Sequence, residues 1–189
     1  MPTQGTPLFE DLENGGLEVS LKYLYADDAY WEKYELACKH LMWLRTTLVS
    51  QLINSFIALH WEYYAECAEL DAKARGLSVQ DFFDECCNFE AELTPYIKER
   101  PTFKPSPLDS IIDCETSSAY RRRVRTIRIG RANGALLRMV SVVDRASLTV
   151  VVSRVLRWHF DRYWEKLYVP QIRAAEAKSF RRLFSKTQE

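Results

Sequence analysis

Residues 28 to 75 read DAYWEKYELACKHLMWLRTTLVSQLINSFIALHWEYYAECAELDAKAR and contain the longest regular hydrophobic pattern in the chain. Apolar side chains recur every three or four residues, the spacing of one helix face, and the row is interrupted only at Arg45. Leu48, Leu52, Phe56 and Leu59 belong to this row and are expected to face the core. The pattern predicts one long helix of about 45 residues, roughly 65–70 Å long. A kink or loop hidden within it remains an alternative.

The residues flanking this pattern are typical helix caps. Asp27 and Asp28 suit the N-terminus, where a carboxylate accepts backbone N–H groups. Gly76 suits a left-handed residue at the C-terminal end. Ser78 and Asp81 then resemble a capping box for a second helix, which packs against the first and closes at Thr94–Pro95.

Four prolines between residues 94 and 110 indicate a linker, and with it an organisation into three parts. Residues 1–26 form a loose arm with a short element, and residues 27–110 form an acidic helical part that includes the linker. Residues 111–189 form a basic, Arg-rich helical part. In it, residues 124–129 favour a short β-strand, with helix as the alternative.

Beyond that strand the pattern is again helical, from Ala135 to about Tyr168. Pro170 is expected to end or kink this run, and a terminal helix follows from Gln171. The expected fold class is therefore mostly α: a helical bundle with a long N-terminal helix and a possible short strand near 124–129.

Net charge is zero, but its distribution is uneven. Residues 1–115 carry 9 Lys+Arg and 21 Asp+Glu, whereas residues 116–189 carry 17 Lys+Arg and 5 Asp+Glu. Six arginines are concentrated in eleven residues: Arg121, Arg122, Arg123, Arg125, Arg128 and Arg131. Guanidinium groups bind phosphates bidentately, so this cluster is the candidate nucleic-acid-binding site, with alternate arginines projecting from one face of the strand.

A second interpretation is that these arginines pair with the acidic part of the chain, for example with Glu62, Glu66 or Glu90, and hold the protein together. The protein would then be a helical protein–protein interaction module. A third function, a helical ribonuclease, is suggested only by the spacing of Arg154 and His159, which would stabilise phosphate charge and transfer a proton.

Other chemistry has little support in the sequence. The five cysteines are scattered, the three histidines form no metal-binding spacing, and there is no phosphate-binding glycine loop. We therefore expect no enzyme activity, metal site or cofactor. With no signal peptide and no apolar run long enough to cross a bilayer, we expect a cytoplasmic protein without a membrane partner.

Two groups of residues resemble the AcaB-like proteins of integrating conjugative elements and conjugative plasmids. They are Ala26-Asp-Asp-Ala-Tyr30 at a helix entry, and Gly134-Ala135 with Asp144, Asp161 and Arg181-Arg182-Leu183-Phe184. The resemblance implies a regulator of conjugation genes with a C-terminal part like that of ribbon–helix–helix proteins. The family's Asn-Pro-Tyr-Gly segment is here only Ala132-Asn133-Gly134.

The sequence therefore predicts a transcriptional regulator of a mobile element that binds nucleic acid, DNA in preference to RNA. A homodimer through the acidic helical part would be its assembly. The target sequence is not predicted.

Overall fold

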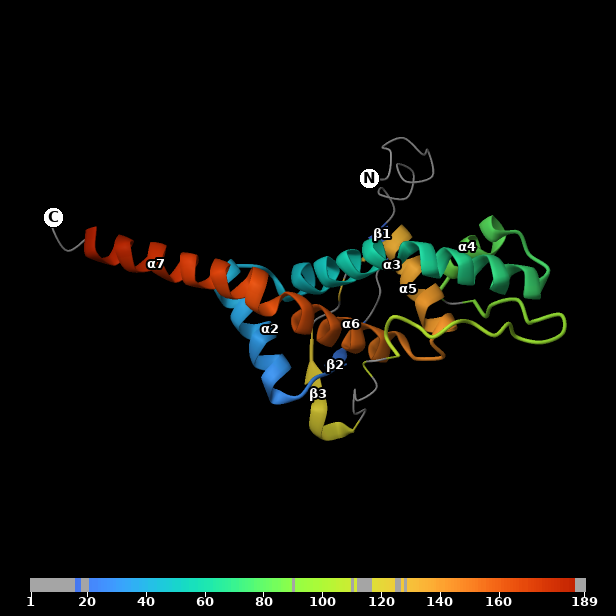
Figure 1. Ribbon diagram of the computed structural model, residues 1–189, viewed down its shortest axis with the longest axis horizontal. Helices are drawn as coiled ribbons and strands as arrows, with labels where there is room; N and C mark the ends of the chain where they lie inside the picture. The colour runs from blue at the N-terminus through green and yellow to red at the C-terminus, as the bar shows by residue number, and fades with distance from the viewer. Residues whose placement is uncertain are drawn as a thin grey trace.

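The computed structural model describes residues 16–17, 21–89, 91–109, 111, 117–124, 127 and 129–185. These residues form a mostly helical molecule, which confirms the predicted fold class (Figure 1). The strands are β1 (Gly16–Leu17), β2 (Tyr23–Tyr25), β3 (Arg121–Arg123) and β4 (Ile129–Gly130). The helices are α2 (Asp28–Leu41), α3 (Arg45–Arg75), α4 (Val79–Cys87), α5 (Arg131–Val143), α6 (Leu148–Tyr163) and α7 (Val169–Ser185), with short turns η1 (Ser118–Tyr120) and η2 (Trp164–Tyr168).

The long N-terminal pattern forms two helices, so the prediction of one continuous helix is wrong. Met42, with φ 54°, turns the chain after α2, and Arg45, the one polar interruption in the apolar row, is the first residue of α3. The Tyr34 hydroxyl donates to the Arg45 carbonyl at 2.8 Å and stabilises the turn. A long helix is still present, because α3 covers 31 residues, with non-helical backbone angles at His60.

The capping predictions for Asp27, Gly76 and Ser78 are confirmed, whereas the second helix, α4, ends at Cys87 and not at Thr94–Pro95. The Asp27 carboxylate accepts the Tyr30 N–H at 3.0 Å, and the Ser78 hydroxyl oxygen accepts the Asp81 N–H at 3.1 Å. Gly76 ends α3 with φ 73°, a left-handed conformation that a residue with a Cβ adopts only at a cost. The Gly76 N–H donates a hydrogen bond to the Lys73 carbonyl at 3.1 Å.

The described residues form no continuous strand over 124–129: β3 ends at Arg123, before that range, and β4 begins at Ile129, the last residue of the range. Arg125, Thr126 and Arg128 lie outside the described residues. β3 pairs antiparallel with β2, and β4 pairs antiparallel with β1. Val124 and Ile127 between them lie outside both strands and are buried in the core. β4 is followed directly by α5 and then by α6.

The helical run expected from Ala135 to Tyr168 is divided into α5, α6 and η2. Arg145, with φ 49°, turns the chain, and the Ser147 side chain caps α6. Pro170 does not end the run; it lies in the first turn of α7, directly after the π-helical turn η2. Since proline lacks the N–H of the regular helical ladder, a π-helical irregularity is expected at this point. No helix in the described part of the chain is long and apolar enough to span a bilayer.

One cluster of buried residues joins the acidic and basic parts. Leu48, Leu52 and Phe56 of α3 are buried as predicted, whereas Leu59 is half-exposed. The Phe56 ring packs edge-on against Trp158 of α6, with ring centroids 5.1 Å apart. The proline-rich segment has no helix or strand over residues 91–109. It is nevertheless held on the helices, because Arg100 donates to the Val142 and Val143 carbonyls, both at 2.8 Å.

Candidate nucleic-acid interface

The first half of the arginine cluster lies on the two-stranded ribbon formed by β2 and β3. Tyr23 lies opposite Arg123, Leu24 opposite Arg122, and Tyr25 opposite Arg121. Leu24 is fully buried, and the Tyr25 N–H donates to the Ser153 hydroxyl of α6 at 2.8 Å. The ribbon is therefore fixed against α6 by one face.

The outer face of the ribbon combines arginine with tyrosine. Arg121 and Arg123 are exposed, and they lie opposite the partly buried Tyr25 and Tyr23. The Arg121 guanidinium carbon lies 3.7 Å from the centroid of the Tyr23 ring, a cation–π contact. The two tyrosine rings meet edge to face with centroids 5.6 Å apart. This arrangement holds an aromatic surface and two cationic groups side by side.

Arg122 has a different environment, because the alternation of a strand turns it to the inner face. Its guanidinium forms an ion pair with Asp28 at the N-terminus of α2. The neighbouring Asp27 pairs in the same way with Arg157 of α6. Burial alone would raise the pKa of Asp27, but the hydrogen bonds from the Tyr30 N–H and Arg157 hold it below its ordinary value of 3.8. Arg122 therefore forms an ion pair within the protein that connects β3 to the start of α2.

The remaining predicted arginines are not all placed by the structure. Arg125 and Arg128 lie outside the described residues. Arg131 is the first residue of α5, and the structure describes its backbone but not its side chain. The structure thus brings Arg121 and Arg123 together on one surface and assigns Arg122 to another.

Internal pairing of the two charged parts occurs, but not with the acids that the sequence suggested. Glu66 pairs with Lys104 of its own part at 3.0 Å, Glu90 lies outside the described residues, and the ion pairs within the described part do not include Glu62. Asp27 and Asp28 are the acids that meet the basic part. The basic part also binds the acidic part through Arg138, which donates to the backbone carbonyls of Glu85, Asn88 and Ala91.

Arg154 and His159 lie five residues apart on α6, so their side chains leave the helix about 140° apart. His159 is buried, and its Nε2 lies 3.0 Å from the Tyr168 hydroxyl. Burial lowers the pKa of His159 to about 4, so that its ring is neutral at neutral pH. Burial raises the pKa of Asp144 to about 6, and the positive charge of Arg154 partly opposes this rise. The structure does not bring Arg154 and His159 together.

Tyr23 and Tyr25 are the residues of this surface that sequence reasoning missed. Their alternation around Leu24 was a strand signal, but it did not reveal which later segment would pair with them. That segment lies almost one hundred residues further along the chain. Among the described residues, no group of three or more His, Cys, Asp or Glu side chains is placed to hold a metal ion.

Comparison with known proteins gives no match for this chain to a family model, to a curated protein or to a solved structure. The likeness to AcaB-like proteins therefore stays a prediction from the residues quoted above.

Proposed function

We propose that this chain is a non-enzymatic nucleic-acid-binding protein that contacts its ligand through the outer face of the β2–β3 ribbon. The observation that carries the proposal is the pairing of exposed Arg121 and Arg123 with Tyr23 and Tyr25 on one fixed surface. Guanidinium groups neutralise phosphates, and tyrosine rings stack on bases. Two-stranded ribbons also enter the major groove of DNA, which supports DNA as the ligand in preference to RNA.

The likeness to AcaB-like proteins suggests a regulatory role in conjugation. The strand–helix–helix order of β4, α5 and α6 supports it, since ribbon–helix–helix proteins share that order. A buried, neutral His159 that is separated from Arg154 supports a non-enzymatic role over a ribonuclease. The proposed activity needs no cofactor.

The experiment is a binding titration by fluorescence anisotropy at several salt concentrations, with labelled duplex DNA, single-stranded DNA and RNA. Replacement of Arg121 and Arg123 by alanine removes up to two phosphate contacts. The log–log salt slope for duplex DNA should then fall by up to about 1.8, because each phosphate contact contributes about 0.9. Melting temperature should change little, since both side chains are exposed.

The matched control replaces Lys73 and Lys98, two exposed cations of the acidic part, by alanine. It changes net charge by the same amount and should leave the salt slope nearly unaltered. Equal losses in the two double variants would contradict the ribbon as the binding surface. So would an absence of binding by the unmodified chain at low salt.

The helical interaction module remains a second candidate because large apolar side chains are exposed in the acidic part. Trp61 of α3 and Val79 of α4 are each more than two-fifths exposed and line the same hollow of the surface. Such residues in one region indicate a protein-binding surface. This function would be favoured if the chain bound no nucleic acid but formed a stable complex through these residues.

A further inference from the structure

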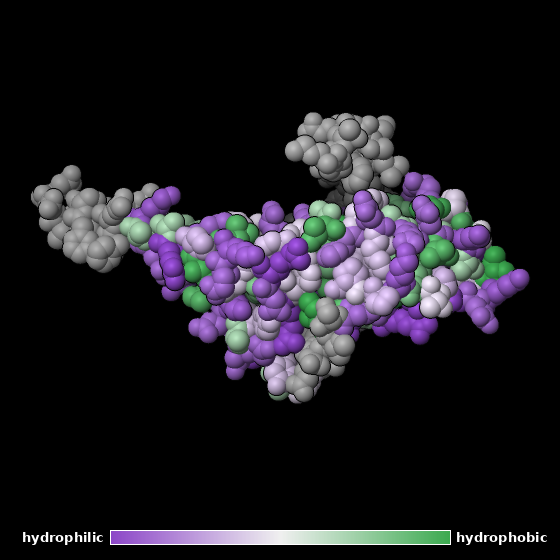
Figure 2. Space-filling model, viewed as in Figure 1, coloured by the Kyte–Doolittle hydropathy of each residue, from purple (hydrophilic) through white to green (hydrophobic). Residues whose placement is uncertain are grey.

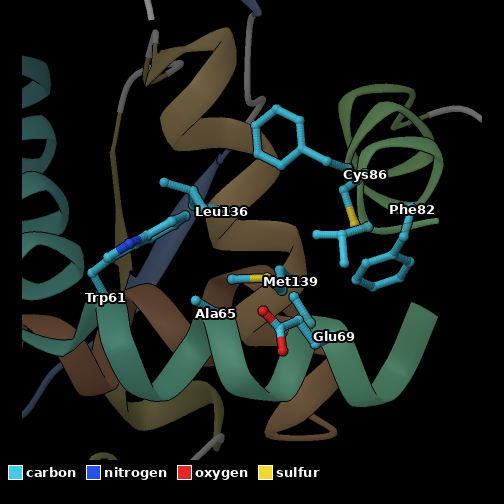
Figure 3. Close-up of a pocket in the computed structure, with 10 residues that line it drawn as sticks. Trp61, Ala65, Glu69, Phe82, Cys86, Leu136 and Met139 are labelled. Atoms are coloured by element: carbon cyan, nitrogen blue, oxygen red, sulfur yellow. The ribbon is translucent and has the colours of Figure 1, made fainter. Parts of the chain in front are cut away.

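A pocket opens between α3 and α4 of the acidic part and α5 of the basic part. Trp61 and Ala65 of α3, Phe82 and Cys86 of α4, and Leu136 and Met139 of α5 converge on it (Figure 3). Its walls are almost entirely apolar, with the carboxylate of Glu69 as the charged group among its lining residues. It is thus a hydrophobic depression between three helices that pack on one another.

The size of the pocket indicates what can enter it. Its volume is about 190 Å³. Sites for drug-sized ligands are larger, about 300–1,000 Å³, so the space suits a protein side chain. Trp61 at its edge is 44% exposed and Val79 is 47% exposed. Removing apolar surface from water is favourable by about 25 cal/mol per Å². An apolar helix face that covered the pocket would therefore be stabilised by the surface it buries.

The charge around the pocket indicates the flanks of the occupant. Residues 61–87, which contribute most of its lining, include seven acidic residues and only two basic ones, Lys73 and Arg75. Arg75 is already paired with Asp71 at 2.6 Å. A complementary helix therefore carries apolar anchors with basic residues beside them.

The C-terminal half of α7 has this composition. Residues 177–185 read AKSFRRLFS, with three basic residues and no acidic residue. Phe180, Leu183 and Phe184 follow the i, i+3, i+4 spacing of an anchoring stripe. Helix α7 joins the body through its first half, where Ile172 packs on the core and Glu176 lies 3.6 Å from His40. The helix then extends away from the body, at the end opposite α4 (Figure 1).

We propose that two copies of this chain exchange their α7 helices. The apolar stripe of one α7 covers the α3–α4–α5 pocket of the partner copy, and Arg181 and Arg182 lie near its acidic surroundings. Helices α7 and α4 lie at opposite ends of the molecule (Figure 1). Two copies arranged about a two-fold axis therefore place each α7 on the α3–α4–α5 pocket of the other copy at the same time. This interaction does not depend on the nucleic-acid role of the ribbon.

Multi-angle light scattering and sedimentation of the full chain test the proposal. We expect a dimer at low salt whose dissociation constant increases with salt. Replacing Phe180 and Phe184 by alanine should raise that constant at least tenfold, equivalent to about 1.4 kcal/mol. Filling the pocket through Ala65→Trp should have the same effect. The control, Leu44→Ala with Leu167→Ala, removes exposed apolar side chains elsewhere and should not change it.

Mixing the variants separates exchange from any indirect effect on folding. A chain with the α7 substitutions keeps its pocket, and an Ala65→Trp chain keeps its α7, so together they form one intact contact. We expect a heterodimer that is tighter than either variant alone, measured by fluorescence energy transfer between labelled chains. A chain that stays monomeric at every concentration would overturn the proposal, even if another protein bound the pocket. A dimer that is insensitive to both variants would also overturn it.

Discussion

Two arginine–aspartate pairs of the molecule lie in different surroundings. At the C-terminus of α3, Arg75 and Asp71 are both buried, and Asp71 also accepts the Tyr96 hydroxyl at 2.7 Å. At the ribbon, Arg122 pairs with Asp28, whose side chain is 97% exposed. Only the buried pair has been removed from water, so its loss leaves an uncompensated charge. Hydrophilic residues occupy much of the visible face in Figure 2, interspersed with hydrophobic ones, and their presence at the surface does not show which charges support the fold.

This difference in burial predicts a large loss of stability when the Arg75–Asp71 pair is broken. Asp71→Ala leaves Arg75 buried without its partner and should reduce the free energy of unfolding by about 3–5 kcal/mol. Chemical denaturation measures the loss. The control is Glu66→Gln, which breaks the exposed pair with Lys104 and should cost less than about 1 kcal/mol. Similar losses for both variants would show that burial is not what distinguishes these pairs.

Buried groups should also determine the response to acid. The pKa of His159 is lowered from 6.5 to about 4 by burial, so the unfolded chain binds a proton more readily between these values. The contribution of His159 to stability is therefore complete above about pH 6.5 and falls as the pH decreases towards 4, by up to about 3 kcal/mol. Asp144, whose pKa is raised to about 6 by burial, acts in the opposite direction over the same range. His159→Phe should remove the His159 contribution to the slope in denaturation curves measured across that range. A slope that persists unchanged would assign it to another group.

Acid should weaken the Asp27 pair only at a lower pH. Because its folded pKa lies below 3.8, its contribution is present above that value and is lost as the pH falls through the folded pKa. Asp27→Asn should therefore differ most from the unmodified protein near neutral pH, and the difference should vanish in strong acid. A difference that vanished already at pH 5 would contradict the lowered pKa.

The smallest effect on stability is expected at the exposed pair of the ribbon. Asp28→Asn should change the free energy of unfolding by less than about 1 kcal/mol, since Asp28 is nearly fully exposed. It also releases Arg122, which should strengthen binding to duplex DNA and steepen the salt slope by up to about 0.9. Anisotropy titrations measure both quantities. An unchanged slope would mean that Arg122 stays on the inner face after its partner is lost.

The sequence by itself determined the features that depend on neighbouring residues. Asp27, Gly76 and Ser78 cap their helices as expected, because a cap is a contact between groups no more than a few positions apart. The helical periodicity of α3 likewise predicted Leu48, Leu52 and Phe56 as core residues. These choices need little information from the rest of the chain.

Only the tertiary structure decided the features that depend on distant residues. The turn at Met42 is accompanied by a hydrogen bond from the Tyr34 hydroxyl to the Arg45 carbonyl, and no glycine or proline marks it in the sequence. Arg121 and Arg122 are adjacent and chemically identical, yet one contacts Tyr23 on the outer face and the other pairs with Asp28. Their different roles follow from the pairing of β3 with β2, because strand register assigns alternate side chains to opposite faces.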